Sequence, residues 1–112
     1  GLCLPYTIEF SVRGDQPTRY GDIARFLGLA ASDEGEAAAS VAAAVRGLAR
    51  SVGQPASLRE AGISPETFEE VLPAIVENAY FDSATLIGQR VPEDDDMEPL
   101  LRCIYEGQPV DF

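Results

Sequence analysis

Few side chains in this sequence could carry out chemistry, and the densest group of them is the acidic run from Glu93 to Asp96. Successive carboxylates could bind Ca²⁺ or Mg²⁺, because these hard cations prefer oxygen ligands. A calcium loop, however, spaces its ligands at alternate positions around a central glycine, and this run has neither feature. Carboxylates are also favourable at the positive end of a helix dipole. We therefore interpret the run as the start of a helix.

The pair Asp82 and Ser83 resembles the Asp-Ser that carries the prosthetic arm in acyl carrier proteins, which are also small, acidic and helical. In that family the serine begins a long amphipathic helix. Gly88 and Pro92 follow too closely here for such a helix to form. The sequence therefore does not favour an acyl carrier.

The sequence contains no histidine. Nucleophilic Ser-His and Cys-His sites need imidazole as a base, and most catalytic zinc or iron sites have at least one imidazole ligand. No glycine-rich turn follows a strand, so a phosphate-binding loop is not expected either. Cys3 and Cys103 have neither disulfide-framework nor metal-knuckle spacing, and we predict free thiols. We expect no catalytic residue, metal ligand or cofactor-binding residue within this chain.

Nineteen acidic residues against eight basic ones give a net charge of -11. Such a field repels phosphate backbones and anionic lipid surfaces, so nucleic acid and membranes are not expected as partners. No apolar run approaches the roughly 20 residues of a membrane span, and no signal-peptide pattern is present. We expect a cytoplasmic protein whose residues 1–112 form a single domain, since this length is close to the commonest domain size.

Apolar residues recur at helical spacing along most of the chain, and no stretch alternates in the manner of a strand. The expected helices cover approximately residues 4–12, 17–27, 33–52, 64–79 and 96–106. Ser57 and Glu60 have capping-box spacing, which predicts one short helical turn over residues 58–61. The predicted fold class is all-α, a bundle of about five helices.

Local signals also predict where these helices begin and end. Ser32 and Ser64 are expected N-caps, and either Asp95 or Asp96 is expected to cap the last helix. Pro73 lies inside the fourth long helix and is expected to kink it or split it, because proline lacks the backbone donor. Residues 82–91 lose the periodicity, and we expect an extended loop there.

Three stretches together resemble the iron-containing alcohol dehydrogenase family. Residues 2–10 (LCLPYTIEF) resemble the segment after the family's last metal-binding His-Gly, although Ser11 stands where that family has Asn. Residues 19–29 (RYGDIARFLGL) and 57–63 (SLREAGI) resemble two further motifs of the family, in the same order and at similar spacing. The resemblance extends through nearly the whole chain.

This resemblance implies a helical C-terminal domain of a larger two-domain enzyme, packed against an N-terminal nucleotide-binding α/β domain of the same parent. In that family one Asp and three His hold Fe²⁺, or sometimes Zn²⁺, at the cleft between the domains. The metal polarises the alcohol or carbonyl oxygen, while NAD(P) accepts or gives the hydride. The last of those histidines would precede Gly1, so the resemblance assigns no metal ligand to any residue of this chain.

One loop of the family that borders the cleft aligns with residues 82–90. The family pattern is Asp-Pro-Cys-Thr-x-x-Asn-Pro-Arg, and Asp82, Thr85 and Arg90 match it. Ala84 replaces the Cys, and Gly88 with Gln89 replaces Asn-Pro, so the pattern does not indicate a substrate. By this resemblance Asp82, Ala84 and Thr85 are candidate residues of a substrate-cleft loop.

The leading hypothesis is thus the C-terminal helical domain of a metal- and NAD(P)-dependent alcohol dehydrogenase or aldehyde reductase, inactive by itself. The alternative is a free-standing acidic helical module that binds another protein. A domain taken from a two-domain enzyme should expose an apolar patch where its neighbour packs, so self-association, for example as a homodimer, is a secondary expectation.

Overall fold

The computed structural model describes residues 1–112, and all of its regular structure is helical. The six helices are α1 (Leu4–Ser11), α2 (Tyr20–Phe26), α3 (Glu34–Ser51), α4 (Pro65–Phe81), α5 (Ser83–Leu86) and α6 (Met97–Glu106). This confirms the all-α fold class predicted from the periodicity. None of the helices is both long enough and apolar enough to cross a lipid bilayer.

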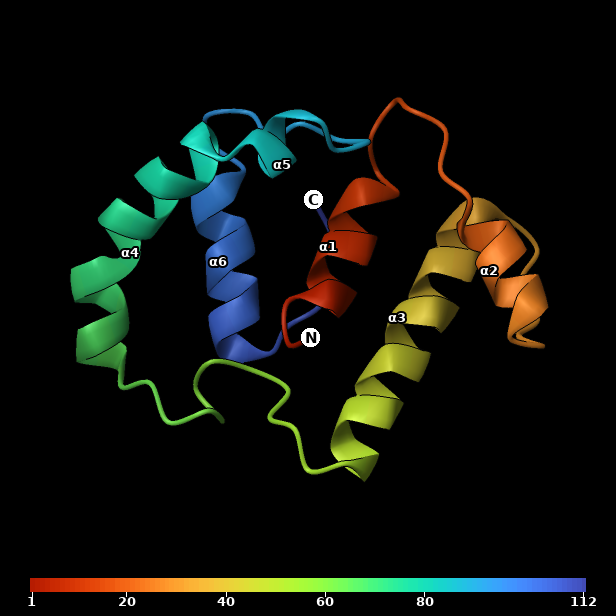
Figure 1. Ribbon diagram of the computed structural model, residues 1–112, viewed down its shortest axis with the longest axis horizontal. Helices are drawn as coiled ribbons and strands as arrows, with labels where there is room; N and C mark the ends of the chain where they lie inside the picture. Colours follow the sequence, from red (N-terminus) through yellow and green to blue (C-terminus); the bar gives the residue numbers. More distant parts are fainter.

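Helix α1 lies at the centre of the fold (Figure 1). It packs against α3 on one side and α6 on the other, and both neighbours come from much later in the chain. Helix α2 packs on α3, while α4 packs on α6 and on the short α5. The molecule is therefore an arc of helices built outward from α1.

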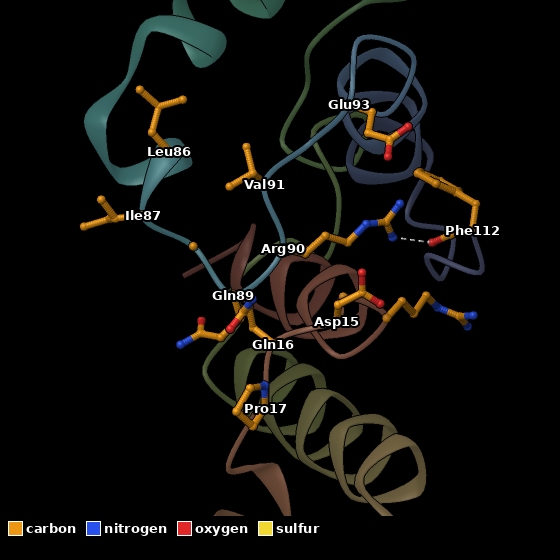
Figure 2. A pocket seen from close by; sticks show the side chains of 13 residues that line it. Asp15, Gln16, Pro17, Leu86, Ile87, Gln89, Arg90, Val91, Glu93 and Phe112 are labelled. Atoms are coloured by element: carbon orange, nitrogen blue, oxygen red, sulfur yellow. Dashed lines mark hydrogen bonds between the residues drawn. The ribbon is translucent and has the colours of Figure 1, made fainter.

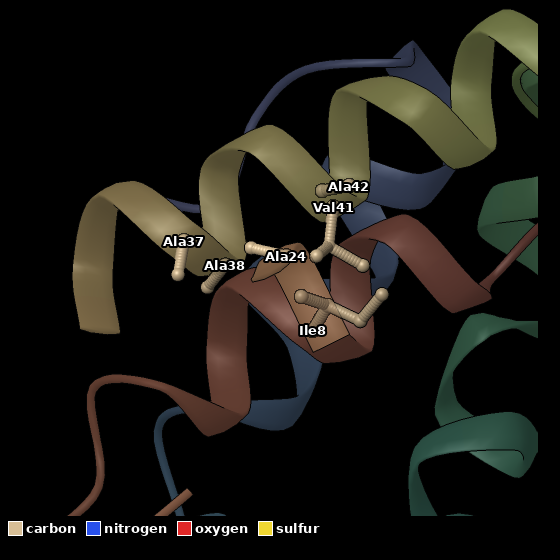
Figure 3. Close-up of a cluster of buried hydrophobic side chains, with 6 residues drawn as sticks. All are labelled: Ile8, Ala24, Ala37, Ala38, Val41 and Ala42. Atoms are coloured by element: carbon tan, nitrogen blue, oxygen red, sulfur yellow. The ribbon is translucent and has the colours of Figure 1, made fainter. Parts of the chain in front are cut away.

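The contact between α1, α2 and α3 depends on alanine (Figure 3). Helix α3 contributes three fully buried alanines, which let its backbone approach closely enough for Ile8 of α1 and Ala24 of α2 to pack against it. The buried residues of this cluster are Ile8, Ala24, Ala37, Ala38, Val41 and Ala42. The alanine-rich run thus forms the interface that joins α3 to two other helices.

Larger side chains form the contacts of α6. Tyr6 and Phe10 of α1 pack with Leu100 and Ile104 of α6, and Val110 from the following tail completes this cluster. On the other side of α6, Phe68 of α4 stacks on Tyr105 with ring centroids 4.1 Å apart. Residues after the last helix therefore belong to the core.

Most of the predicted helix ends are correct, and two helix starts are shifted. The second helix was expected from about residue 17, but α2 begins at Tyr20, because the Glu34 carboxylate accepts the amides of Tyr20 and Gly21 and fixes the start there. The Ser64 hydroxyl caps α4 by accepting the backbone amide of Thr67 at 3.2 Å, as predicted. The N-cap of α3, however, is Asp33, whose carboxylate accepts the Glu36 amide at 2.8 Å. The Glu36 carboxylate in turn accepts the amide and the hydroxyl of Ser32. The prediction of Ser32 was wrong by one position, because both residues can cap and Asp33 has the extended backbone that a cap needs.

Two further expectations are only partly right. Pro73 was expected to kink or split its helix, and the split does not occur, because α4 runs as one helix from Pro65 to Phe81 with Pro73 inside it. Phe68 and Leu72 before the proline and Val76 after it pack in one cluster with α6. Residues 82–91 are not wholly extended, since α5 forms one helical turn there. The predicted helical turn over residues 58–61 is confirmed: the Ala61 amide donates to the Ser57 carbonyl oxygen, four residues back, at 3.0 Å, and the Glu60 amide donates to the Ser57 hydroxyl at 3.1 Å. Both cysteines are free thiols.

Candidate functional site

The loop identified by the resemblance begins with a local turn that its own residues stabilise. The Asp82 carboxylate accepts the backbone amide of Ala84 at 2.7 Å, and the Asp82 carbonyl oxygen accepts the amide of Thr85 at 3.1 Å. An aspartate that bonds the backbone two residues ahead favours a helical turn. Asp82 is therefore the N-cap of α5, a signal that was present in the sequence and not recognised.

Directly after α5 the chain borders an open hollow of about 860 Å³ (Figure 2). Its walls are residues 86–91 on one side and residues 13–17, the turn after α1, on the other. Glu93 and Phe112 complete the lining. Two segments far apart in the sequence thus meet at one site.

The candidate residues Asp82, Ala84 and Thr85 do not line this hollow. Asp82 and Ala84 are exposed and Thr85 is half-buried, and all three lie within the four residues that precede the wall. The second half of the same aligned loop, from Leu86 to Arg90, does line it. The turn at residues 13–17 was predicted as a break between helices, but nothing in its sequence indicated which segment it faces.

Arg90 holds the wall of the hollow to the rest of the fold. Its Nη2 donates to both carboxylate oxygens of Asp96, at 2.9 and 3.0 Å, and its Nη1 donates to the backbone carbonyl of Phe112 at 2.7 Å. The guanidinium also lies over the ring of Phe10, 3.9 Å from its centroid. One side chain therefore connects the loop to α1, to the start of α6 and to the tail.

The acidic run at residues 93–96 is confirmed as the start of a helix, with Asp96 as the N-cap residue of α6. The Asp96 side chain makes no bond to the helix amides; it accepts the amide of Glu93 and the guanidinium of Arg90 instead. No three His, Cys, Asp or Glu side chains of the chain are grouped so that they could hold a metal ion. The Asp96 carboxylate thus serves to pair with Arg90 and to hold the backbone of Glu93.

Apolar side chains around α5 are left uncovered. Phe81 is 82% exposed and Ile87 is 83% exposed, and Leu86 and Val91 beside them are also exposed. Isolated apolar residues on a surface are normal, whereas grouped ones are typical of surfaces that bind another protein or domain.

Comparisons with known proteins agree with the resemblance. A family model described as the Fe-containing alcohol dehydrogenase family, C-terminal, matches residues 1–105. An NADPH-dependent butanol dehydrogenase of Clostridium saccharobutylicum is 32% identical over 111 residues, which make up 99% of this chain and 28% of that protein. An aldehyde-alcohol dehydrogenase of Streptococcus pneumoniae serotype 4 is 30% identical over 121 residues, covering 95% of this chain and 14% of that protein.

The chain thus spans between 14% and 28% of the length of these two curated relatives, and both matches include almost all of its own residues. The chain belongs to the Fe-containing alcohol dehydrogenase family and corresponds to that family's C-terminal part.

Proposed function

We propose that residues 1–112 form the single helical C-terminal domain of a metal- and NAD(P)-dependent alcohol dehydrogenase or aldehyde reductase. The observation that carries this proposal is the family match over residues 1–105. The two relatives, an NADPH-dependent butanol dehydrogenase and an aldehyde-alcohol dehydrogenase, support the reaction class and the coenzyme class.

The residues of this chain do not fit a metal centre of that family. There is no histidine in the sequence, and no grouping of carboxylates or thiols could replace the missing imidazoles. The proposal therefore assigns the Fe²⁺ or Zn²⁺ ligands and the NAD(P) site to the remainder of the parent protein. The contribution of this chain is structural, because it supplies one wall of the cleft in which the substrate binds.

Within this chain we assign residues 82–91, which include the wall of the hollow, to the surface that faces the N-terminal nucleotide-binding domain. Two features of the segment support this assignment. Asp82 and Ala84 are exposed at the turn of α5, and Phe81 and Ile87 beside them present apolar surface that nothing in the chain covers. A neighbouring domain would bury this surface and bring its own residues to the turn.

The proposal is tested with the full-length parent protein, purified and freed of metal with a chelator. We expect oxidation of primary alcohols with NAD⁺ or NADP⁺ to disappear with the metal and to return when Fe²⁺ or Zn²⁺ is added back. Full activity in the metal-free protein, or none with any short alcohol under either metal, would contradict the proposal.

A second experiment uses the purified 112-residue chain to test the division of roles. Titration calorimetry with NAD⁺ and NADP⁺ should show no binding, because the chain has no phosphate-binding turn after a strand. Tight binding of either coenzyme to the isolated chain would show that the coenzyme site had been assigned to the wrong part of the parent.

A further inference from the structure

After α5, the wall of the hollow is hydrogen-bonded to the rest of the fold through a single side chain. Among residues 88–92, hydrogen bonds are made only by the amide of Gly88, which donates to Thr85 at 3.4 Å, and by the guanidinium of Arg90. The Gly88 bond lies inside the segment, so it cannot fix the position of the segment relative to the helices. Only the hydrogen bonds of Arg90 can fix the position of this segment relative to the helices.

The contacts of Arg90 are of the kind that fix a geometry. A guanidinium is planar and rigid, and here it meets the Asp96 carboxylate, the Phe112 carbonyl and the face of the Phe10 ring together. Only 19% of its side chain is exposed, and 14% of that of Asp96. Solvent screening of this ion pair is therefore weak, and the side chain has little freedom to adopt another rotamer.

Close packing on the other side of the segment adds a second constraint. A Cβ atom added at Gly14 would lie 2.7 Å from the Cβ of Arg90 and 3.0 Å from the carbonyl oxygen of Gln89. The backbone of the wall thus rests directly on the turn after α1, where only glycine leaves enough room. In Figure 2 the Arg90 side chain runs toward Phe112, away from Leu86 and Ile87, whose side chains lie on the opposite side of the segment.

We propose that Arg90 is a positioning residue for the substrate cleft: its guanidinium, held by Asp96 and Phe112, fixes residues 86–91 on Gly14 and so sets the shape of the wall. This inference rests on the proposed function, since it takes residues 86–91 as part of that cleft. Phe112 lies beyond residues 1–105, so the hydrogen bond between Arg90 and Phe112 lies partly outside the family-matched part of the chain.

The test uses the full-length protein with the variants Arg90→Met, Arg90→Lys and Gly14→Ala. The matched control is Arg46→Met, because Arg46 is also a little-exposed guanidinium (18%) that pairs with a carboxylate and lies over an aromatic ring, outside the hollow. Each variant is measured by thermal unfolding, by hydrogen exchange of a peptide spanning residues 82–92, and by kcat and KM for a primary alcohol.

We expect Arg90→Met to speed exchange of the Leu86 and Gly88 amides about tenfold, since these two amides donate the hydrogen bonds of the segment and its local opening is then no longer opposed by its anchor. We expect KM to rise about tenfold as well, because a small misplacement of a binding wall is costly in an active site. Gly14→Ala should raise the exchange rate and KM in the same direction. The values for Arg90→Lys should fall between those of Arg90→Met and wild type, since lysine keeps the charge but lacks the planar guanidinium. Arg46→Met should lower the unfolding temperature and leave both quantities near wild type.

If Arg90→Met changes exchange and KM no more than Arg46→Met does, Arg90 is merely structural and the inference is wrong. If the wild-type protein oxidises no alcohol, the proposed function fails separately. The exchange measurement then still decides whether Arg90 holds residues 86–91.

Discussion

The carboxylate of Glu9 on α1 pairs with the guanidinium of Arg46 on α3 through two hydrogen bonds, one of them 2.9 Å long. The same carboxylate accepts the backbone amide of Val110 at 3.0 Å. Glu9 thereby joins the central helix to α3 and to the tail after α6. The side chains are only 13% and 18% exposed, so the pair is largely shielded from water.

We predict that Arg46→Met destabilises the fold by about 3 kcal/mol, because removing one partner of a buried pair leaves the other charge uncompensated. The control is Arg102→Met, which also removes a guanidinium paired with carboxylates, but one that is 43% exposed. That variant should unfold close to the wild-type midpoint. Chemical denaturation of the two variants compares them directly, and equal midpoints would contradict this view of Glu9.

A carboxylate from α3 caps α2, and this predicts a pH dependence. Glu34 accepts the hydroxyl of Thr18 at 2.7 Å and the amides of Tyr20 and Gly21 at 3.0 Å. Chiefly the Thr18 hydroxyl, and then the Gly21 amide, hold the pKa of Glu34 below its usual range. A lowered pKa in the folded state means that Glu34 stabilises the fold above the ordinary glutamate pKa, and that this stability is lost as pH falls through the lowered one.

Glu34→Gln should therefore unfold more easily than wild type at about pH 7, and the two should converge as pH falls through the lowered pKa of Glu34, below which both side chains are neutral. Glu77→Gln, an exposed position on α4 where the carboxylate makes no hydrogen bond, serves as the control. Urea unfolding at a series of pH values measures the difference. A difference in the free energy of unfolding between Glu34→Gln and wild type that stays constant across these pH values would exclude the Glu34 cap as its cause.

Pro73 is exposed in the interior of α4, where it removes one helix hydrogen bond. Pro73→Ala should raise stability by about 1 to 2 kcal/mol, since the helical gain of alanine exceeds the extra entropy of the unfolded chain. Pro65→Ala is the matched control, because proline is well tolerated at the first helical position. Thermal unfolding of both variants is the measurement, and a less stable Pro73→Ala would mean that the proline favours the packing of α4 on α6.

The helices could be predicted from the sequence because their signals are local. The Ser64 cap, the left-handed Gly107 after α6 and the spacing of Phe68 and Leu72 all act within a few residues. The alanine run of α3 predicted a helix but not its buried face, since alanines at successive positions give no contrast between sides. Only the packing of Ile8 and Ala24 shows which alanines are inside.

The site was less predictable because it is not local. The resemblance identified the loop 82–90, and Arg90 matched its pattern, but the partners Asp96 and Phe112 are determined by tertiary packing. The turn at Gly14 gave no sign that it would support this loop. The fold follows largely from periodicity and caps, whereas the walls of the hollow depend on how the helices meet.

Whether residues 82–91 border the substrate is tested most directly by enlarging Ala84 in the full-length protein. We predict that Ala84→Leu lowers kcat/KM for butanol relative to ethanol by about tenfold, because the added volume narrows the cleft at that wall. The control Ala74→Leu, at an exposed position on α4, should leave this ratio unchanged. If Ala84→Leu also leaves the ratio of the two alcohols unchanged, these residues do not face the substrate and the assigned role of the chain is wrong.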